Sequence, residues 1–348
     1  MLEIQALNLR SIDDSTALVL NRLMNRIRLE RLPDDPPTPL DQDLQGWRNL
    51  PEFEEELAWL VWNEDHTDLD ASGGLEIWNT EDNRHLCFFD IVVIPECRRQ
   101  GLAKQLLARI AEAARQNDRR LMMAGSNGRV PAGTAFLRSI GAQPGMEART
   151  NQLKLAELDR RLVEDWLASS VELQTRFSLG FWDGNYPEEQ LEAVVEMFEI
   201  ANDEPHDQLE IEDRKITGEM LRQMEQYRNA RRVERWTTYV VENSTGKFCG
   251  FTEVFWNPNQ PTIIQQGFTG VHPDYRGQKF GRWLKAAMLD KVLRDRPQAT
   301  MVRTRNANSN AAMMAINDKL GFKPYLAETL WQVETAKVLE SQGVKMQG

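Results

Sequence analysis

A short loop between an expected strand and an expected helix carries the residues that point most clearly to chemistry. The stretch from His272 to Leu284 reads HPDYRGQKFGRWL; a strand-like run ends before it at Val271, and Gly281 lies in the first turn of the helix expected next. Backbone N–H groups in such a loop lack partners at the helix N-terminus, and the helix dipole adds partial positive charge. Both features attract phosphate groups. The stretch therefore predicts a site for a phosphorylated cofactor without indicating which one.

The same pattern occurs once more, earlier in the chain. Aligning Val93 with Val271 gives an offset of 178 residues, at which IPECRRQGLA meets HPDYRGQKFG. A later helix is expected to end at a glycine in each half, Gly141 and Gly321, at nearly the same spacing. Over residues 93–106, the residues identical at this offset in the first copy are Val93, Pro95, Arg98, Gln100 and Leu106. The shared order of strand, loop, helix, strand, helix and glycine indicates an internal duplication.

Elements of matching type surround both copies. Apolar runs predict strands over His85–Ile94 and Thr262–Val271, and apolar residues at helical spacing predict a helix after each loop. The tail Lys323–Glu334 is expected to form a final strand. A short helix is expected over Gln45–Glu56. The segment Asp203–Arg235 is expected to be helical, with its many charges on a solvated face.

The length and charge of the chain limit its class. A chain of 348 residues suits two domains, which we expect over residues 1–155 and 173–348 with a linker helix over 156–172. The net charge of −11 argues against a nucleic-acid binder and against binding to an anionic membrane surface. No apolar run approaches the roughly 18 residues of a membrane-spanning helix. We therefore expect neither nucleic acid nor membrane as a partner, and the oligomeric state stays open.

Cysteine and histidine usage limits the chemistry further. Cys87, Cys97 and Cys249 show no CxxC spacing, and the four histidines are scattered. This pattern predicts neither a disulfide framework nor a zinc site, and we expect no metal. The first residues lack the basic and apolar regions of a secretion signal, so a cytoplasmic location is expected.

The repeated loop resembles the acetyl-CoA pyrophosphate signature of the GNAT N-acetyltransferase superfamily, (Gln/Arg)-x-x-Gly-x-(Gly/Ala). In the first copy the matching residues are Arg98, Gly101 and Ala103. In the second copy Arg276 and Gly281 match, but Lys279 stands where the middle glycine is usual, which questions the tightness of that turn. The later stretch NANSNAAMMAINDKLGF, residues 306–322, also resembles the family's second half. The chain is thus similar to a tandem GNAT protein over about 70 residues near 85–155 and again near 262–334.

This resemblance implies the fold and the cofactor. Each domain would be an α/β (α+β) unit with a mixed, mostly antiparallel sheet flanked by helices, in which the fourth and fifth strands splay apart. The implied cofactor is acetyl-CoA, whose pantetheine arm would pair with the fourth strand as an added strand does. The backbone groups that would meet this arm belong to Ile91, Val92 and Val93 in the first domain and to Thr269, Gly270 and Val271 in the second. The pyrophosphate would lie against the loop residues Arg98, Arg99, Gln100, Gly101, Leu102, Ala103, Arg276, Gly277, Gln278, Lys279, Phe280 and Gly281.

The implied reaction is direct attack by an amine, which must first lose a proton to a base. Asp90 interrupts the apolar strand CFFDIVV, and Glu253 lies in GFTEVFW of the second half. Both are candidate bases, because a strand interior is an unfavourable place for a carboxylate. The alternative is that each carboxylate faces solvent or bonds a loop.

The family's usual acid is a tyrosine four residues before the glycine that ends the last helix, and here the two positions are Leu137 and Asn317. Neither is a usable acid. Asn317, Asn306 and Asn310 could instead bond the cofactor's sulfur or carbonyl, although helix capping is the commoner role of asparagine at such places.

Together these features predict an acetyl-CoA-dependent N-acetyltransferase that acts on the primary amine of a small molecule. The asparagine-rich stretch favours the second domain as the active one, whereas the first has the better glycine loop. The alternative is a non-catalytic acyl-CoA-binding protein, a sensor or a scaffold, which the missing acid and Lys279 would suit.

Overall fold

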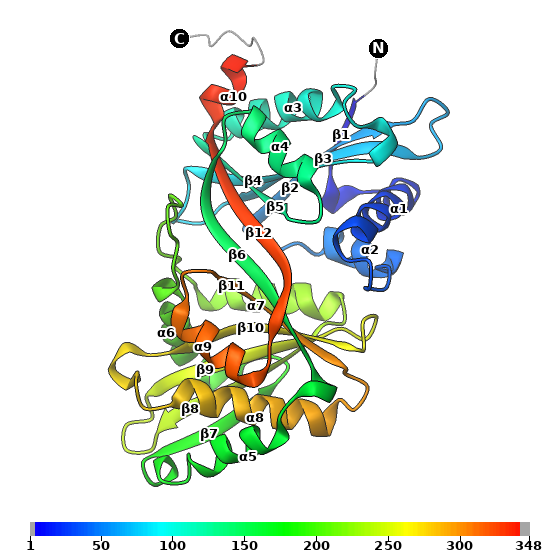
Figure 1. Cartoon of the computed structure of the whole chain (residues 1–348). Coiled ribbons are helices and arrows are strands. Elements are labelled where there is room, and N and C mark those ends of the chain that lie inside the picture. Colours follow the sequence, from blue (N-terminus) through cyan, green and yellow to red (C-terminus); the bar gives the residue numbers. More distant parts are fainter. Residues whose placement is uncertain (1–3, 342–348) are drawn as a thin grey trace. The chain divides into compact units, whose positions relative to one another are not determined.

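The computed structural model describes residues 4–341 (Figure 1). Contacts group them into two compact units. The first contains the residues up to Glu147, the segment His206–Asp213 and the residues from Ala327; the second contains Ala148–Pro205 and Arg214–Leu326. The outer ends of the two expected domains, residues 1–3 and 342–348, lie outside the described residues.

The sheet of the first unit has the strand order β1-β2-β3-β4-β5-β12. Its neighbouring strands pair antiparallel, apart from the parallel pair of β4 and β5. The strands are β1 (Ile4–Asn8), β2 (Glu54–Trp62), β3 (Leu69–Trp78), β4 (Leu86–Val93), β5 (Leu121–Asn127) and β12 (Lys323–Glu334).

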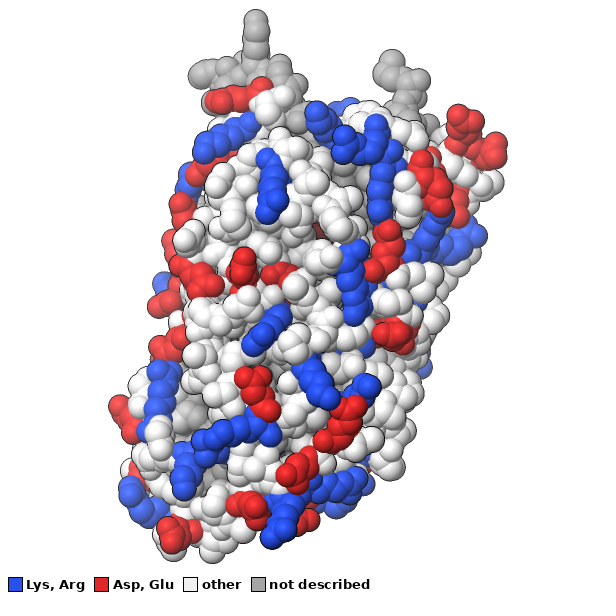
Figure 2. Space-filling model, viewed as in Figure 1, with Lys and Arg blue, Asp and Glu red and all other residues white. Residues whose placement is uncertain are grey.

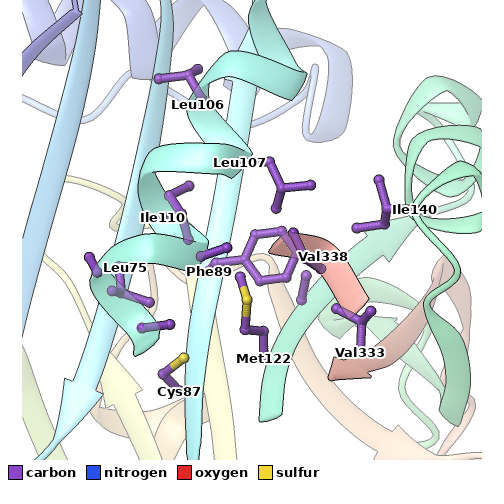
Figure 3. Packing of buried hydrophobic residues seen from close by; sticks show 14 of the residues in the cluster. Leu75, Cys87, Phe89, Leu106, Leu107, Ile110, Met122, Ile140, Val333 and Val338 are labelled. Atoms are coloured by element: carbon purple, nitrogen blue, oxygen red, sulfur yellow. The ribbon is translucent and has the colours of Figure 1, made fainter. Parts of the chain in front are cut away.

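Helices cover both faces of this sheet. One apolar cluster joins α1 (Asp14–Arg31) to residues of β2 and β4, and Asp13 caps that helix through its carboxylate. The other cluster lies under α3 (Leu102–Gln116) and includes Phe89, Leu107 and Met122 (Figure 3). The remaining helices are α2 (Leu40–Arg48), α4 (Pro131–Ser139) and α10 (Thr335–Ser341).

The second unit repeats this plan with the strand order β7-β8-β9-β10-β11-β6. Only β10 and β11 pair parallel among the described pairs of this unit. The strands are β6 (Gln143–Lys154), β7 (Phe177–Asp183), β8 (Glu234–Glu242), β9 (Phe248–Trp256), β10 (Ile263–Val271) and β11 (Met301–Ala307). The helices are α5 (Arg160–Ala168), α6 (Leu191–Phe198), α7 (Gly218–Ala230), α8 (Phe280–Asp295) and α9 (Ala311–Leu320).

Two helices were predicted at the wrong positions. The short helix expected over Gln45–Glu56 is α2, which ends at Arg48 because Pro51 cannot continue a helix, and Glu54–Glu56 belong to β2. In the segment expected to be helical over Asp203–Arg235, only α7 is an α-helix. Part of the remainder is held by the first unit, where the Gln208 N–H donates to the Gly145 carbonyl at 2.9 Å.

Two long strands divide the chain differently from the expected boundaries. β6 enters the second unit at Ala148 and pairs with β11 there, and β12 enters the first unit at Ala327 and pairs with β5. The expected linker helix is α5, which packs against α8 inside the second unit through a cluster containing Val163 and Trp166. The boundaries 1–155, 156–172 and 173–348 remain a prediction from the sequence.

In each unit the central parallel pair separates partway along its length. β4 and β5 pair from Leu86 to Phe88, and β10 pairs with β11 from Ile263 to Gln266. Beyond these points the fourth strand of each unit runs on to its loop, so both units have the predicted splay.

The surface and the helices give two further observations. Acidic and basic side chains are interspersed over the face drawn in Figure 2. Across residues 4–341, no helix has both the length and the apolarity needed to cross a membrane.

Candidate functional site

The loop after β4 adopts a conformation that exposes its amides. Arg99 (φ 65°) and Gly101 (φ 87°) are both left-handed, and Gly101 is the N-cap of α3. The first amides of a helix have no intrahelical acceptor, and α3 has no acidic residue in its first turn. A Cβ placed on Gly101 would meet no atom within 4 Å, so the space in front of the loop is open. The loop can therefore accept an anion at the helix N-terminus.

The loop after β10 has the same conformation, but its glycine occupies the first of the two left-handed positions instead of the second. Its two left-handed residues are Gly277 (φ 78°) and Lys279 (φ 68°), and Lys279 is the N-cap of α8. Each copy thus has one glycine and one larger residue at its two left-handed positions. The missing glycine at Lys279 leaves the turn intact, at a strain of about 1 kcal/mol for a non-glycine residue in this region.

The signature arginines hold these loops to their own units. The Nε atoms of Arg98 and Arg276 each donate to the carbonyl of the last residue of the preceding strand, at 3.0 Å. The guanidinium of Arg98 also pairs with Glu30 at the end of α1, and that of Arg276 with Asp203 at 2.5 Å. Because both side chains are engaged in this way, the loops offer phosphate their backbone N–H groups.

A cavity of about 530 Å³ opens in the first unit where β4 and β5 diverge. Its walls are β4, β5, the loop, the start of α3, α4 and the end of α1, and they bring together most of the residues predicted for the first cofactor site. Basic side chains also line it, from Arg31, Arg99 and Lys104. The predicted residues that line it are Ile91, Val92, Val93, Arg98, Arg99, Gly101, Leu102 and Ala103.

The matching region of the second unit carries bulkier side chains. At an offset of 180 residues, Met313 takes the position of Gly133, which lines the first cavity. A Cβ on Gly281 would lie 3.2 Å from the Ile316 side chain. On β10, a bulge between Gln266 and Thr269 shifts the pairing with β9 just where the splay begins. Thr269, Gly270 and Val271 follow this bulge as the predicted pantetheine contacts.

Asp90 lies where β4 leaves β5, one residue before the cavity wall. It pairs across the sheet with Gly74 of β3, and its Oδ1 atom lies 2.4 Å from where a Cβ on Gly74 would stand. The glycine therefore leaves room for the carboxyl group. Solvent reaches Asp90, yet the surrounding protein removes enough water to raise its pKa, against the opposing charge of Arg31. A carboxylate of raised pKa beside a cavity is suited to accept a proton.

Glu253 lies in a different environment on β9. Only 5% of it is exposed, and it accepts hydrogen bonds from the Tyr186 hydroxyl and, at 3.2 Å, from the Thr237 hydroxyl. Burial and the adjacent carboxylate raise the pKa of Tyr186 well above its usual value. These contacts occupy the Glu253 carboxylate inside the unit, which makes Asp90 the better-placed candidate base.

The asparagines of the second unit form a buried chain that begins at a lysine. Lys285 Nζ donates to Asn317 Oδ1, and Asn317 Nδ2 donates to Asn306 Oδ1, both at 2.9 Å. Asn310 instead caps α9 by accepting from the Met313 N–H at 3.2 Å. Sequence reasoning missed Lys285. Its signal was the 178-residue offset, which places it opposite the buried Leu107.

Replacing Lys285 by methionine is expected to remove a pH dependence of stability. Burial lowers the pKa of this amine to about 7 from 10.5, so between these values the unfolded chain binds more protons than the folded one. The free energy of unfolding of the wild type should therefore rise with pH across this window, and the variant should lack that rise. Urea unfolding at several pH values measures it, with Lys323→Met as the exposed-lysine control. A variant that keeps the wild-type slope would contradict the assignment.

Comparison with known proteins identifies the family of this fold and site. The model of the acetyltransferase (GNAT) family matches residues 21–140 and 194–322. These two matches cover more than half of the chain, one in each half, and the chain belongs to the GNAT acetyltransferase family as a tandem protein. Members of this family generally use acetyl-CoA.

Solved structures extend this result. The chain is similar to a tandem GNAT protein from the clavulanic acid biosynthesis pathway, with 25% identity, a TM-score of 0.77, and coverage of 96% of this chain and 99% of that one. A GCN5-related N-acetyltransferase from Sphaerobacter thermophilus shares the fold at 15% identity and a TM-score of 0.67, over 96% of this chain and 97% of that chain. The glucosamine N-acetyltransferase region of a fungal multi-domain β-N-acetylglucosaminidase also shares the fold, at 10% identity and a TM-score of 0.64. This match covers 96% of this chain and 38% of that chain. No curated protein matches the chain significantly.

Proposed function

We propose that this protein is an acetyl-CoA-dependent N-acetyltransferase that acts on the primary amine of a small molecule, and that its first unit binds the cofactor. The observation that carries the proposal is the cavity of about 530 Å³ between the diverging β4 and β5, which opens beside the amides of the Gly101 loop. Family membership and the acid-free first turn of α3 support it.

Different residues of the first unit would have different roles in binding and catalysis. The amides of Gly101, Leu102 and Ala103 would hold the pyrophosphate, and the edge of β4 that no longer pairs with β5 beyond Phe88 would hold the pantetheine arm. Acetyl-CoA would supply the acetyl group as a thioester. Asp90 would take the proton that the ammonium of the acceptor must lose before the amine can attack. A β4 N–H group beside the carbonyl would stabilise negative charge on its oxygen. Leu137 cannot donate a proton, so water would protonate the departing thiolate.

A matched pair of substitutions tests where the cofactor binds. Ala103→Glu places a carboxylate in the first cavity at a helix N-terminus, where a glutamate does not disfavour the helix. Gly281→Glu is its counterpart at the 178-residue offset. Titration with acetyl-CoA should show affinity at least about tenfold lower for Ala103→Glu, from an added negative charge and lost space, and near wild-type affinity for Gly281→Glu. The opposite pattern would move the site to the second unit, and loss in neither variant would contradict the phosphate-binding role of both loops.

A screen of small primary amines, read as release of free thiol, tests the reaction itself. Turnover of at least one amine supports the enzyme. The buried contacts of Glu253 and the apolar Leu137 favour a second candidate, a non-catalytic acyl-CoA sensor. Acetyl-CoA binding without turnover of any amine in the panel would favour that candidate.

A further inference from the structure

A buried network of charges joins α7 to β8 and β9 in the second unit. Glu225, which is 1% exposed, accepts from Arg222 Nη1 at 2.6 Å and from Arg235 Nη2 at 2.9 Å. Arg235 lies 3.4 Å from the centre of the Tyr186 ring and also donates to the Gly184 carbonyl at 2.8 Å. Both arginines therefore have a carboxylate partner.

Arg228, one helical turn from Glu225, differs from these two arginines. Its described side-chain contact is with the Phe255 ring, 5.9 Å from Cζ, and within residues 4–341 no hydrogen bond or ion pair joins it to an acid. Burial lowers the pKa of this guanidinium to about 10, and the like charge of Arg235 acts in the same direction. Glu253 and Glu225 offset part of this effect through space. A half-buried cation is thus left with its hydrogen-bond donors unused.

Arg228 is one of the residues that line a cavity of about 350 Å³. Arg228, Arg232 and Arg235 line it from the last turn of α7, the following loop and the start of β8. Trp256 and Pro258 supply an apolar wall. Glu234 also lines the cavity, but its carboxylate pairs with Arg296. The cavity therefore combines positive charge with one apolar side.

We propose that this cavity is a binding site for a small organic oxyanion, a carboxylate or phosphate group on a body of a few carbon atoms, with Arg228 as its principal contact. A planar guanidinium can bond two oxygens of either group at once. The Trp256 wall suits the carbon body, and the volume lies at the lower end of the range for small-molecule sites.

The site is separate from the predicted cofactor loop of the same unit. Trp256 pairs with Ile264 near the start of β10, whereas Gly250 pairs with Val271 beside the loop. The cavity thus lies at the opposite end of β9 from Gly277–Gly281. A ligand here would not be the pyrophosphate of acetyl-CoA, and the proposal stands independently of the proposed transferase activity.

Isothermal titration calorimetry of the full chain with inorganic phosphate, and separately with succinate, tests the site. We expect at least one probe to bind the wild type, with affinity at least tenfold lower for Arg228→Met. Arg176→Met is the matched control, because it removes a positive charge from the same unit at a side chain that is 70% exposed and outside the cavity. It should leave binding unchanged. The probe that binds more tightly identifies the group as phosphate or carboxylate.

Two further measurements distinguish ligand binding by Arg228 from a purely structural role. Arg228→Lys keeps the charge but loses the planar fork, so its affinity should fall between those of the wild type and Arg228→Met. Acetyl-CoA at saturation should not displace the probe. Equal affinity in the wild type and Arg228→Met, displacement by acetyl-CoA, or no binding of either probe would each overturn the proposal. So would an Arg228→Met variant that unfolds more readily than Arg176→Met in anion-free buffer.

Discussion

Replacing Asp90 by asparagine is expected to lower kcat for amine acetylation by about 10²- to 10⁴-fold, the usual contribution of a positioned base. Asparagine has nearly the same shape and cannot accept a proton, so the KM for acetyl-CoA should change little. The wild-type rate should also fall as the pH drops through the raised pKa of Asp90, because only the carboxylate is a base. The variant should have lost this acid limb. Steady-state kinetics between pH 5 and 8 measure both effects.

The same substitution separates catalysis from folding. A raised carboxyl pKa means that the folded state binds more protons than the unfolded state, so this group costs stability as the pH rises above the ordinary carboxyl pKa. Asp90→Asn removes that cost, and the variant should be at least as stable as the wild type at neutral pH. Glu253→Gln is the competing substitution. If it lowers kcat more than Asp90→Asn does among folded samples, the base belongs to the second unit.

Replacing Arg235 by methionine is expected to reduce the free energy of unfolding by about 3–5 kcal/mol, as breaking a buried ion pair does. The change leaves the buried Glu225 carboxylate without its 2.9 Å partner and the Gly184 carbonyl without two donors. It also removes the guanidinium stacked on Tyr186. Urea unfolding followed by tryptophan fluorescence measures the loss.

The control for this prediction is an arginine in an exposed pair. Arg294 bonds Asp290 one turn away on α8, and its side chain is 62% exposed. Arg294→Met should cost at most about 0.5 kcal/mol, the usual value for such helix pairs. A loss below about 1 kcal/mol for Arg235→Met would show that the network relaxes around the missing arginine.

The parts of the fold that the sequence predicted are those set by local patterns. The last strand was predicted with the observed bounds Lys323–Glu334, and β10 to within one residue, because apolar runs there end at glycine, proline or charged residues. The repeated loop was found from its spacing alone. Local patterns do not specify partners, and so β7 was missed. Its Gly180 fits under the ring of Tyr239 on β8, a contact visible only in three dimensions.

The candidate site divides in the same way. Residues of the first loop and of β4 were predicted from the signature, and the structure places them around one cavity. The partners of the charged residues could not be predicted, because they come from distant segments: Glu30 for Arg98, Asp203 for Arg276 and Tyr186 for Glu253. The asparagine-rich stretch suggested chemistry in the second unit, but two of its residues bond Lys285 or each other. Their use inside the protein shifts our proposal to the first unit.

The course of β12 has a consequence for synthesis. The first unit contains the residues up to Glu147, but β5 pairs with a strand that begins only at Lys323. During translation, a nascent chain that has emerged as far as β11 contains all the elements around the cavity of the first unit. Its β5 still lacks β12, the strand that pairs with it in the complete protein. The first half made by the ribosome is thus completed last, and the partly made chain exposes an unpaired edge strand.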